Sequence, residues 1–189
     1  MGEIVAALYV ETGGVYFGLP DVDPWDEERD ARRYLGPHPV VAHPPCNRWS
    51  KLASGRRQRD GQDGGCFAHA LAAVTQYGGV LEHPAYSLAW QAFGLPKPPL
   101  YGWAQCIGWD GWCCAVDQRW YGHEMRKPTW LYVSGNPCEV RWGIGPPSNM
   151  SVQRSYGGGK RQAMRSRTPT AFRDLLLTMA RMNARGVAT

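Results

Sequence analysis

Short apolar runs, separated by polar loops that are rich in glycine and proline, form the main pattern along the chain. Three runs, at residues 4–10, 39–42 and 80–81, are continuous, which is typical of strands buried on both faces of a parallel sheet. Residues 129–133 are aromatic and β-branched and alternate as a strand does, and a further strand is expected near residues 111–116. The pattern predicts a sheet that is mostly parallel.

Helical signals lie between and after these strands. Residues 67–77 are rich in alanine and are followed by two glycines, a pattern that predicts a helix and its end. A last helix is expected with Thr168 as N-cap and Pro169 at its first position, and shorter helices are expected at residues 26–34 and 86–93. Since the helix at 67–77 lies between two predicted strands, it forms a βαβ crossover, and the predicted fold class is α/β.

Length and composition further restrict the number of domains, the location and the state of the cysteines. A chain of 189 residues can bury one sizeable core, so a single domain over residues 1–189 is expected. No run of about 18 apolar residues occurs, and the first residues lack the pattern of a signal peptide, which predicts a cytoplasmic protein without a membrane span. The six cysteines are then expected to be thiols, ligands or nucleophiles rather than disulfides.

Cys46 has the most informative position in the sequence. It follows the apolar run at 39–42 and two prolines, Pro44 and Pro45, which cannot continue a sheet ladder. The cysteine is therefore expected just beyond the carboxyl end of a strand, where open α/β sheets bind ligands. On these residues alone, Cys46 is either a nucleophile on a stiff loop or a buried structural thiol.

The segment Pro45-Cys46-Asn47-Arg48-Trp49-Ser50 resembles the catalytic loop of C5-cytosine DNA methyltransferases, Pro-Cys-Gln-x-Phe-Ser. Residues 8–19 resemble the cofactor loop of that family, with Glu11 in place of its first glycine, and residues 80–84 resemble the strand that supplies its catalytic glutamate. Residues 118–126 resemble loosely its Gln-x-Arg-x-Arg strand, and residues 165–169 the stretch before its last helix.

This resemblance implies a Rossmann-like three-layer sandwich, reduced relative to full-length methyltransferases and without a separate target-recognition domain. As an enzyme, such a protein would be a DNA (cytosine-5-)methyltransferase-like transferase, and compact members of this kind are often phage-encoded. Cys46 would add to C6 of a pyrimidine, Glu82 would act at N3, and Ser50 and Arg126 would hold the base or its phosphate. A simpler interpretation of Glu82 is that it caps the helix that follows.

S-adenosylmethionine is the cofactor that the resemblance implies. The positions that match or replace its binding residues are Tyr9, Thr12, Gly13, Gly14, Asp21, Asp23 and Pro45. Only seven positions separate Gly14 from Asp21, too few for a crossover helix and a strand, so this half of the fold is expected to be shortened or rebuilt. The two glycines alone are more typical of an ordinary turn than of a nucleoside-binding loop.

DNA or a pyrimidine nucleotide is the expected partner, and the net charge of +5 permits an anionic ligand. The basic residues assigned to nucleic-acid binding are Arg48, Arg56, Arg57, Lys160, Arg161 and Arg165. Because no target-recognition domain is present, a protein partner would choose the DNA site. The alternative function is a non-catalytic nucleic-acid-binding or inhibitory protein that retains the fold.

A zinc site competes for the same cysteine. The pairs His43-x-x-Cys46 and Cys66-x-x-His69 have the spacing of a zinc knuckle or ribbon, and a zinc-binding module would make Cys46 a ligand. The prolines between His43 and Cys46, and the helix expected around His69, argue against this interpretation. No metal is therefore assigned.

Overall fold

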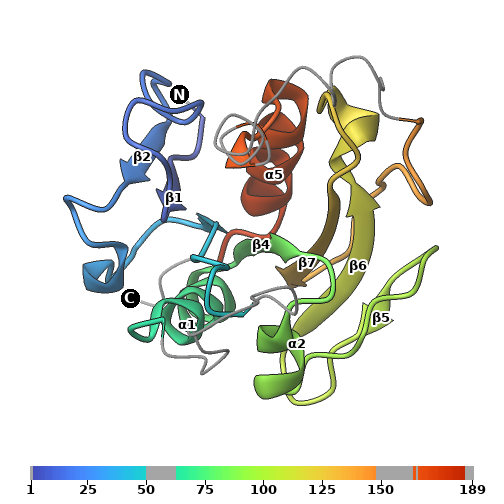
Figure 1. The fold of residues 1–189 in the computed structure, drawn as a ribbon. Helices are drawn as coiled ribbons and strands as arrows, with labels where there is room; N and C mark the ends of the chain where they lie inside the picture. The colour runs from blue at the N-terminus through green and yellow to red at the C-terminus, as the bar shows by residue number, and fades with distance from the viewer. Residues whose placement is uncertain (1, 50–62, 148–163, 165, 186–189) are drawn as a thin grey trace.

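The computed structural model describes residues 2–49, 63–147, 164 and 166–185, which form an α/β fold around one mixed sheet (Figure 1). In these residues the sheet has seven strands in the order β2-β1-β3-β4-β7-β6-β5. Their bounds are β1 (Val5–Leu8), β2 (Val22–Trp25), β3 (Val40–Ala42), β4 (Gly79–Pro84), β5 (Ala104–Gln105), β6 (Gly111–Asp117) and β7 (Pro128–Ser134).

The mostly parallel sheet that the sequence predicts is found in one half only. Strands β2, β1, β3 and β4 pair in parallel, whereas β7, β6 and β5 continue the sheet with antiparallel pairings. Between β6 and β7 lies a short connection that holds only the 3-10 helix η2 (Gln118–Tyr121), too little for a crossover to a parallel neighbour. Residues 118–126 are therefore not the strand that the family resemblance suggests.

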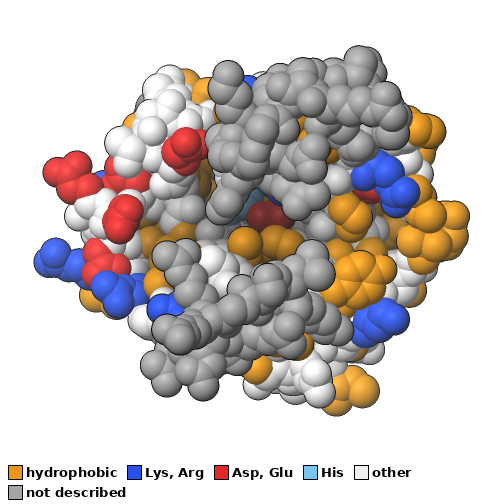
Figure 2. All heavy atoms as spheres, viewed as in Figure 1, with side chains coloured by type: hydrophobic (Ala, Val, Ile, Leu, Met, Phe, Trp, Pro, Cys, Tyr) orange, Lys and Arg blue, Asp and Glu red, His pale blue; other side chains and the backbone are white. Residues whose placement is uncertain are grey.

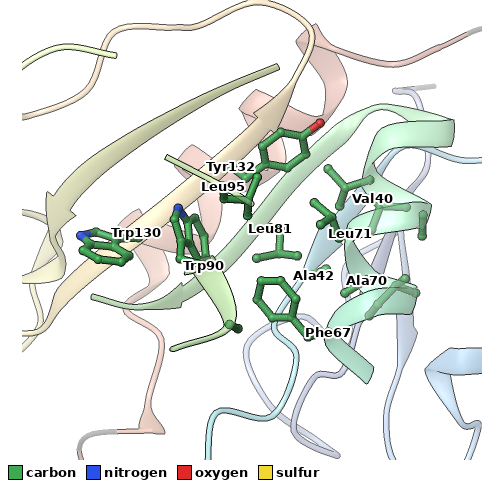
Figure 3. Packing of buried hydrophobic residues seen from close by; sticks show 14 of the residues in the cluster. Val40, Ala42, Phe67, Ala70, Leu71, Leu81, Trp90, Leu95, Trp130 and Tyr132 are labelled. Carbon is green, nitrogen blue, oxygen red and sulfur yellow. The ribbon is translucent and has the colours of Figure 1, made fainter. Parts of the chain in front are cut away.

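Helices cover both faces of the sheet. The helix α1 (Cys66–Tyr77) packs Phe67 and Leu71 against the face that includes Leu81 (Figure 3). Leu8 belongs to the same core cluster. On the other face, α5 (Thr170–Met182) packs its own apolar side chains against Val5, Ala7 and Val41. In the described part of the chain, no helix is long and apolar enough to span a membrane.

Most sequence-predicted elements are confirmed near their expected bounds, including the β3-α1-β4 crossover with parallel strands. The helix expected at residues 86–93 is the shorter α2 (Leu88–Ala92), and the helix expected at 26–34 is only the 3-10 turn η1 (Ala31–Arg33). Here the Asp26 and Asp30 carboxylates accept hydrogen bonds from backbone N–H groups, which favours turns over a continuous helix. The last helix has Pro169 rather than Thr168 as its N-cap.

Strand β2 was not predicted, because Val22–Trp25 lies in a stretch that appears in the sequence as an acidic loop. It forms the sheet edge, where Pro24 removes no necessary ladder hydrogen bond. The chain passes from β1 to β2 through turns, without a helix. The shortened connection that the sequence predicts is thus confirmed, and β1 has one parallel neighbour on each side, β2 and β3.

Candidate active site

A cavity of about 690 Å³ opens at the carboxyl ends of β1, β3 and β4. This is the point where the strand order reverses direction, between β1 and β3, and where open α/β sheets bind ligands. Figure 2 shows acidic and histidine surface at the floor of a hollow in the middle of this face. The lining residues are Tyr9, Val10, Glu11, Gly14, Val15, Tyr16, His43, Pro44, Pro45, Cys46, Glu82, Pro84, Lys127, Ser166, Arg167 and Thr168.

Cys46 lies on a loop that is anchored at both ends. At its start, the His43 N–H donates to the Leu8 carbonyl over 3.0 Å, so the loop begins against β1. At its end, the buried Trp49 donates from Nε1 to Asp63 over 2.9 Å. Cys46 itself is exposed and lines the cavity, which agrees with a position beyond the strand end and not with a buried structural thiol.

Glu82 lies within β4, which extends beyond the apolar run at residues 80–81. Its neighbours Leu81 and His83 point to the α1 side, so alternation along the strand directs Glu82 to the opposite side. It is buried, and it lines the cavity with Cys46. The helix-cap interpretation does not apply, since Ser87 accepts the capping hydrogen bond from the Ala89 N–H of α2.

A chain of hydrogen bonds holds the Glu82 carboxylate. Its Oε2 atom lies 3.0 Å from Nδ1 of His43, and Nε2 of the same ring lies 2.8 Å from the Tyr16 hydroxyl. Its Oε1 atom accepts from Nε2 of Gln118 over 3.1 Å, and that nitrogen also donates to Thr129 Oγ1 over 3.0 Å. The chain therefore runs from the β1–β2 connection, across β3 and β4, to β7.

These contacts keep Glu82 charged. Burial on its own raises the pKa of the carboxyl group, but the hydrogen bond from His43 and the positive charge of Lys127 lower it to about 2. Glu82 is consequently a carboxylate at neutral pH. A carboxylate accepts hydrogen bonds and donates none, so a ligand must present a hydrogen-bond donor to it.

Lys127 brings a positive charge to the same cavity. Its Nζ atom donates to the Arg167 carbonyl over 3.0 Å, and burial lowers its pKa while Glu82 and Cys46 oppose that effect. Although Cys46 is exposed to the cavity, the protein atoms around it shield it partly from water. This shielding and the charge of Glu82 raise the pKa of Cys46, and Lys127 acts in the opposite direction. The cysteine is accordingly a thiol at neutral pH, with a cation close enough to favour its thiolate.

Asp117 fixes the backbone of Lys127. The Oδ1 atom of this buried carboxylate accepts from the Lys127 and Arg119 N–H groups, over 3.0 Å each. Its Oδ2 atom accepts from Nε of Arg126 over 3.1 Å. Arg126, to which the family resemblance assigns a base-holding role, thus pairs with Asp117 and does not line the cavity, whereas its neighbour Lys127 does.

The residues assigned to S-adenosylmethionine separate into two groups. Tyr9, Gly14 and Pro45 line the cavity, and Thr12, Gly13, Asp21 and Asp23 do not. The Gly14 N–H donates to the Glu11 carbonyl over 2.9 Å, so the glycine turn closes on itself.

The acidic candidates at β2 are occupied by protein groups. Asp21 pairs with Arg181, and Asp23 accepts from Trp25 and Arg29. Thr12 donates to Asp26 rather than facing the cavity. Asp21, Asp23 and Thr12 are thus engaged by protein groups outside the cavity and do not fit the role of holding S-adenosylmethionine there.

The four candidate zinc ligands have other partners or positions. Both ring nitrogens of His43 are engaged by Glu82 and Tyr16, and Nδ1 of His69 lies 3.2 Å from the Tyr9 hydroxyl. Within residues 2–49, 63–147, 164 and 166–185, no group of three or more His, Cys, Asp or Glu side chains is placed to hold a metal ion. Cys46 and Cys66 are thus not joined in a metal-binding group.

The remaining predictions concern the basic and hydroxyl residues. Arg48 lies on the Cys46 loop, outside the lining of the cavity. The others lie outside the described residues, and they are Ser50, Arg56, Arg57, Lys160, Arg161 and Arg165.

Sequence reasoning missed Tyr16 and Lys127, and it assigned His43 only to a metal. The position of His43, directly after a buried strand, is the one signal that indicates a ligand-facing role.

No model of a known protein family matches the chain, and no curated protein matches it.

Proposed function

We propose that the protein binds a pyrimidine base, in DNA or in a nucleotide, and modifies it through a covalent adduct between Cys46 and ring atom C6. One observation carries this proposal: the Cys46 thiol, the Glu82 carboxylate and the Lys127 ammonium line a single cavity at the carboxyl ends of adjacent strands. The resemblance to C5-cytosine methyltransferases assigns the same roles to Cys46 and Glu82. A Rossmann-like three-layer sandwich is part of the proposal, supported by helices on both faces and the β2-β1-β3-β4 order.

The proposed addition uses the groups in the cavity as follows. The Cys46 Sγ atom gives its proton to water and forms a bond to C6, and Lys127 stabilises the thiolate before it attacks. The C5=C6 electron pair moves to C4–C5, and the C4=N3 pair moves to N3, which takes up a proton from water, so that the adduct as a whole gains no charge. The Glu82 carboxylate then accepts a hydrogen bond from the new N3–H, which stabilises the adduct.

In the adduct, C5 behaves as an enamine carbon. It takes a proton from water and loses the original C5 hydrogen to water. Loss of the N3 proton to water and departure of the thiolate then restore the N3=C4 and C5=C6 bonds. The C5 hydrogen of the base is therefore exchanged with water without any cofactor. The rate of this hydrogen exchange measures the contributions of Cys46 and Glu82. It does not depend on which electrophile the C5 atom attacks in the complete reaction.

The size of the cavity suits this substrate class. A volume of about 690 Å³ lies in the range of ligand sites for small molecules, and a nucleoside fits within it. A base inside a duplex has to leave the stack to reach Cys46, so single-stranded DNA and free nucleotides are the favoured test substrates. A protein partner that selects the DNA site belongs to the same proposal.

The test measures release of tritium to water from deoxycytidine monophosphate or single-stranded DNA labelled at C5 of cytosine. We expect release by the full chain, loss of release in Cys46→Ala, and a decrease of at least about 100-fold in Glu82→Gln. Cys138→Ala is the matched control, since Cys138 lies outside the cavity. Absence of exchange with every pyrimidine substrate, with DNA binding that Cys46→Ala leaves intact, supports the non-catalytic alternative instead.

A further inference from the structure

We infer that Cys106 and Cys113 form a reversible disulfide when the protein is exposed to a peroxide, and that this bond fastens the edge strand β5 to β6. The two Sγ atoms lie 3.0 Å apart, and both side chains are buried. A disulfide bond joins its sulfur atoms at about 2.05 Å, so a small movement of the two side chains is enough to form it. This inference does not depend on the function proposed for the Cys46 cavity.

The backbone brings the two thiols to the same side of the sheet. Cys106 follows β5, where its N–H donates to the Gly111 carbonyl over 3.0 Å, and Cys113 lies two positions further along β6. Both thiols belong to the core cluster that contains Trp90. The next residue, Cys114, belongs to the cluster on the opposite face, as alternation along a strand requires. Cys106 therefore has Cys113, and not Cys114, as its partner.

The turn between the two cysteines is ordered. The Trp109 N–H donates to the Cys106 carbonyl over 3.0 Å, and the Gly111 N–H donates to the Trp109 carbonyl over 2.9 Å. The Trp109 indole donates from Nε1 to the Phe93 carbonyl over 3.0 Å, which ties the turn to the end of α2. Because the protein already holds the thiols in contact, the disulfide needs little further ordering of the chain.

An oxidant reaches the pair from the edge of the sheet. Strand β5 has two residues and is the last strand of the sheet, and Ile107, next to Cys106, is 92% exposed. Burial and the neighbouring Cys106 raise the pKa of Cys113, so the reactive thiolate is rare while β5 is in place. Local opening of this short edge strand exposes Cys106 to water and to small oxidants. Oxidation is therefore expected to be slow and to require no unfolding of the central strands.

The proposed oxidation has two steps. The Cys106 Sγ atom gives its proton to water and attacks one oxygen of hydrogen peroxide, which breaks the O–O bond, forms a sulfenic acid and releases hydroxide. The Cys113 Sγ atom gives its proton to water and attacks the sulfenic sulfur, which forms the S–S bond and releases a second hydroxide. The two protons neutralise the two hydroxides. Two thiols are thus oxidised to one disulfide, and the peroxide is reduced to two molecules of water.

Peptide mapping tests whether the bond forms. The reduced full chain is treated with hydrogen peroxide, unfolded in iodoacetamide to block the remaining thiols, and cleaved before aspartate without reductant. Because Asp110 lies between the two cysteines, their disulfide keeps residues 63–109 joined to residues 110–116. We expect this joined pair in the wild type and in the matched control Cys114→Ala. It should be absent in Cys106→Ala and in Cys113→Ala.

Thermal unfolding measures the effect of the bond on the fold. A crosslink between Cys106 and Cys113 lowers the conformational entropy of the unfolded chain, so peroxide treatment should raise Tm by about 5 °C or more. Dithiothreitol should reverse the shift, Cys114→Ala should keep it, and Cys106→Ala should lack it. Since Cys106 lies at the end of an edge strand, this variant serves even if Cys113→Ala does not fold.

Three results would each overturn the inference. The first is a peroxide-treated wild type in which Cys106 and Cys113 are both alkylated. The second is an equal Tm for the oxidised and the reduced protein, and the third is loss of the joined peptides in Cys114→Ala.

Discussion

Nδ1 of His43 lies 3.0 Å from Oε2 of Glu82, although 39 positions separate the two residues along the chain. Parallel pairing of β3 with β4 brings them together, and the Tyr16 hydroxyl holds the other side of the imidazole ring. His43 therefore keeps the Glu82 carboxylate oriented and charged, and in the proposed reaction it is a positioning residue that acts through Glu82.

Replacing His43 tests this role. In His43→Phe the carboxylate loses a hydrogen bond but stays buried, so burial raises the pKa of Glu82 from about 2 toward or above its ordinary value. The C5-exchange rate falls at acid pH as Glu82 is protonated. In His43→Phe we expect this fall to occur at a pH that is higher by at least about one pH unit. His43→Gln, which keeps a donor, should restore much of the wild-type profile, and His38→Gln is the control. An unchanged acid limb in His43→Phe would contradict the role.

Lys127 should control the ionisation of Cys46. In Lys127→Met the charge that favours the thiolate is lost, and the pKa of Cys46 rises further above its ordinary value. The pH dependence of iodoacetamide alkylation at Cys46, followed by peptide mass spectrometry, should shift to higher pH by up to about one pH unit. Arg126→Gln is the matched control, because that guanidinium pairs with Asp117 outside the cavity. An equal shift in both variants would indicate a general change of structure.

The elements that define the site could be predicted because their signals are local. The apolar run before Pro44 and Pro45 ends β3 by backbone chemistry alone, and the glycines after Tyr77 end α1. The βαβ crossover then requires parallel strands, which places Cys46 and Glu82 at the same sheet edge.

What could not be predicted depends on contacts between distant residues. The ring of His43 is held by Tyr16 and Glu82, and Lys127 reaches the cavity because the carboxylate of Asp117 fixes its backbone. No local pattern encodes these partners. Strand β2 was not predicted for a related reason. Its residues form a strand because they pair with β1, and not because they are hydrophobic.

His83 should make the protein less stable at moderately acid pH. Its ring is fully buried against Phe67 and Trp90, and burial lowers its pKa to about 4, with Glu82 and the Pro45 and Pro44 carbonyls opposing. Between pH 6.5 and 4 the unfolded chain therefore binds a proton that the folded chain does not. The free energy of unfolding is expected to fall by about 3 kcal/mol over this range as the pH decreases.

Urea denaturation at a series of pH values measures this slope. In His83→Phe the decrease between pH 6.5 and 4 should be much smaller, because no ring nitrogen remains to be protonated in the unfolded chain. Below pH 4.5 both proteins should lose further stability as Glu82 is protonated, since its pKa is low only in the folded state. If the free energy of unfolding of His83→Phe falls with pH as steeply as that of the wild type, groups other than His83 cause the decrease.

Gly79 is the position at which a single added methyl group should separate the two halves of the candidate active site. It begins β4 with a φ of 124°, and a Cβ atom there would lie 2.0 Å from the carbonyl oxygen of Val40, its partner in β3. Neither backbone can move without breaking the β3–β4 ladder that aligns Cys46 with Glu82. We expect Gly79→Ala to lower the free energy of unfolding by more than about 3 kcal/mol and to abolish C5 exchange.

Gly108→Ala is the matched control. Gly108 has a left-handed φ of 88° but open space around it, so this substitution should lower the free energy of unfolding by only about 1 kcal/mol and leave C5 exchange in place. Equal losses in the two variants, measured by urea denaturation, would mean that backbone conformation and not the contact with Val40 decides the effect.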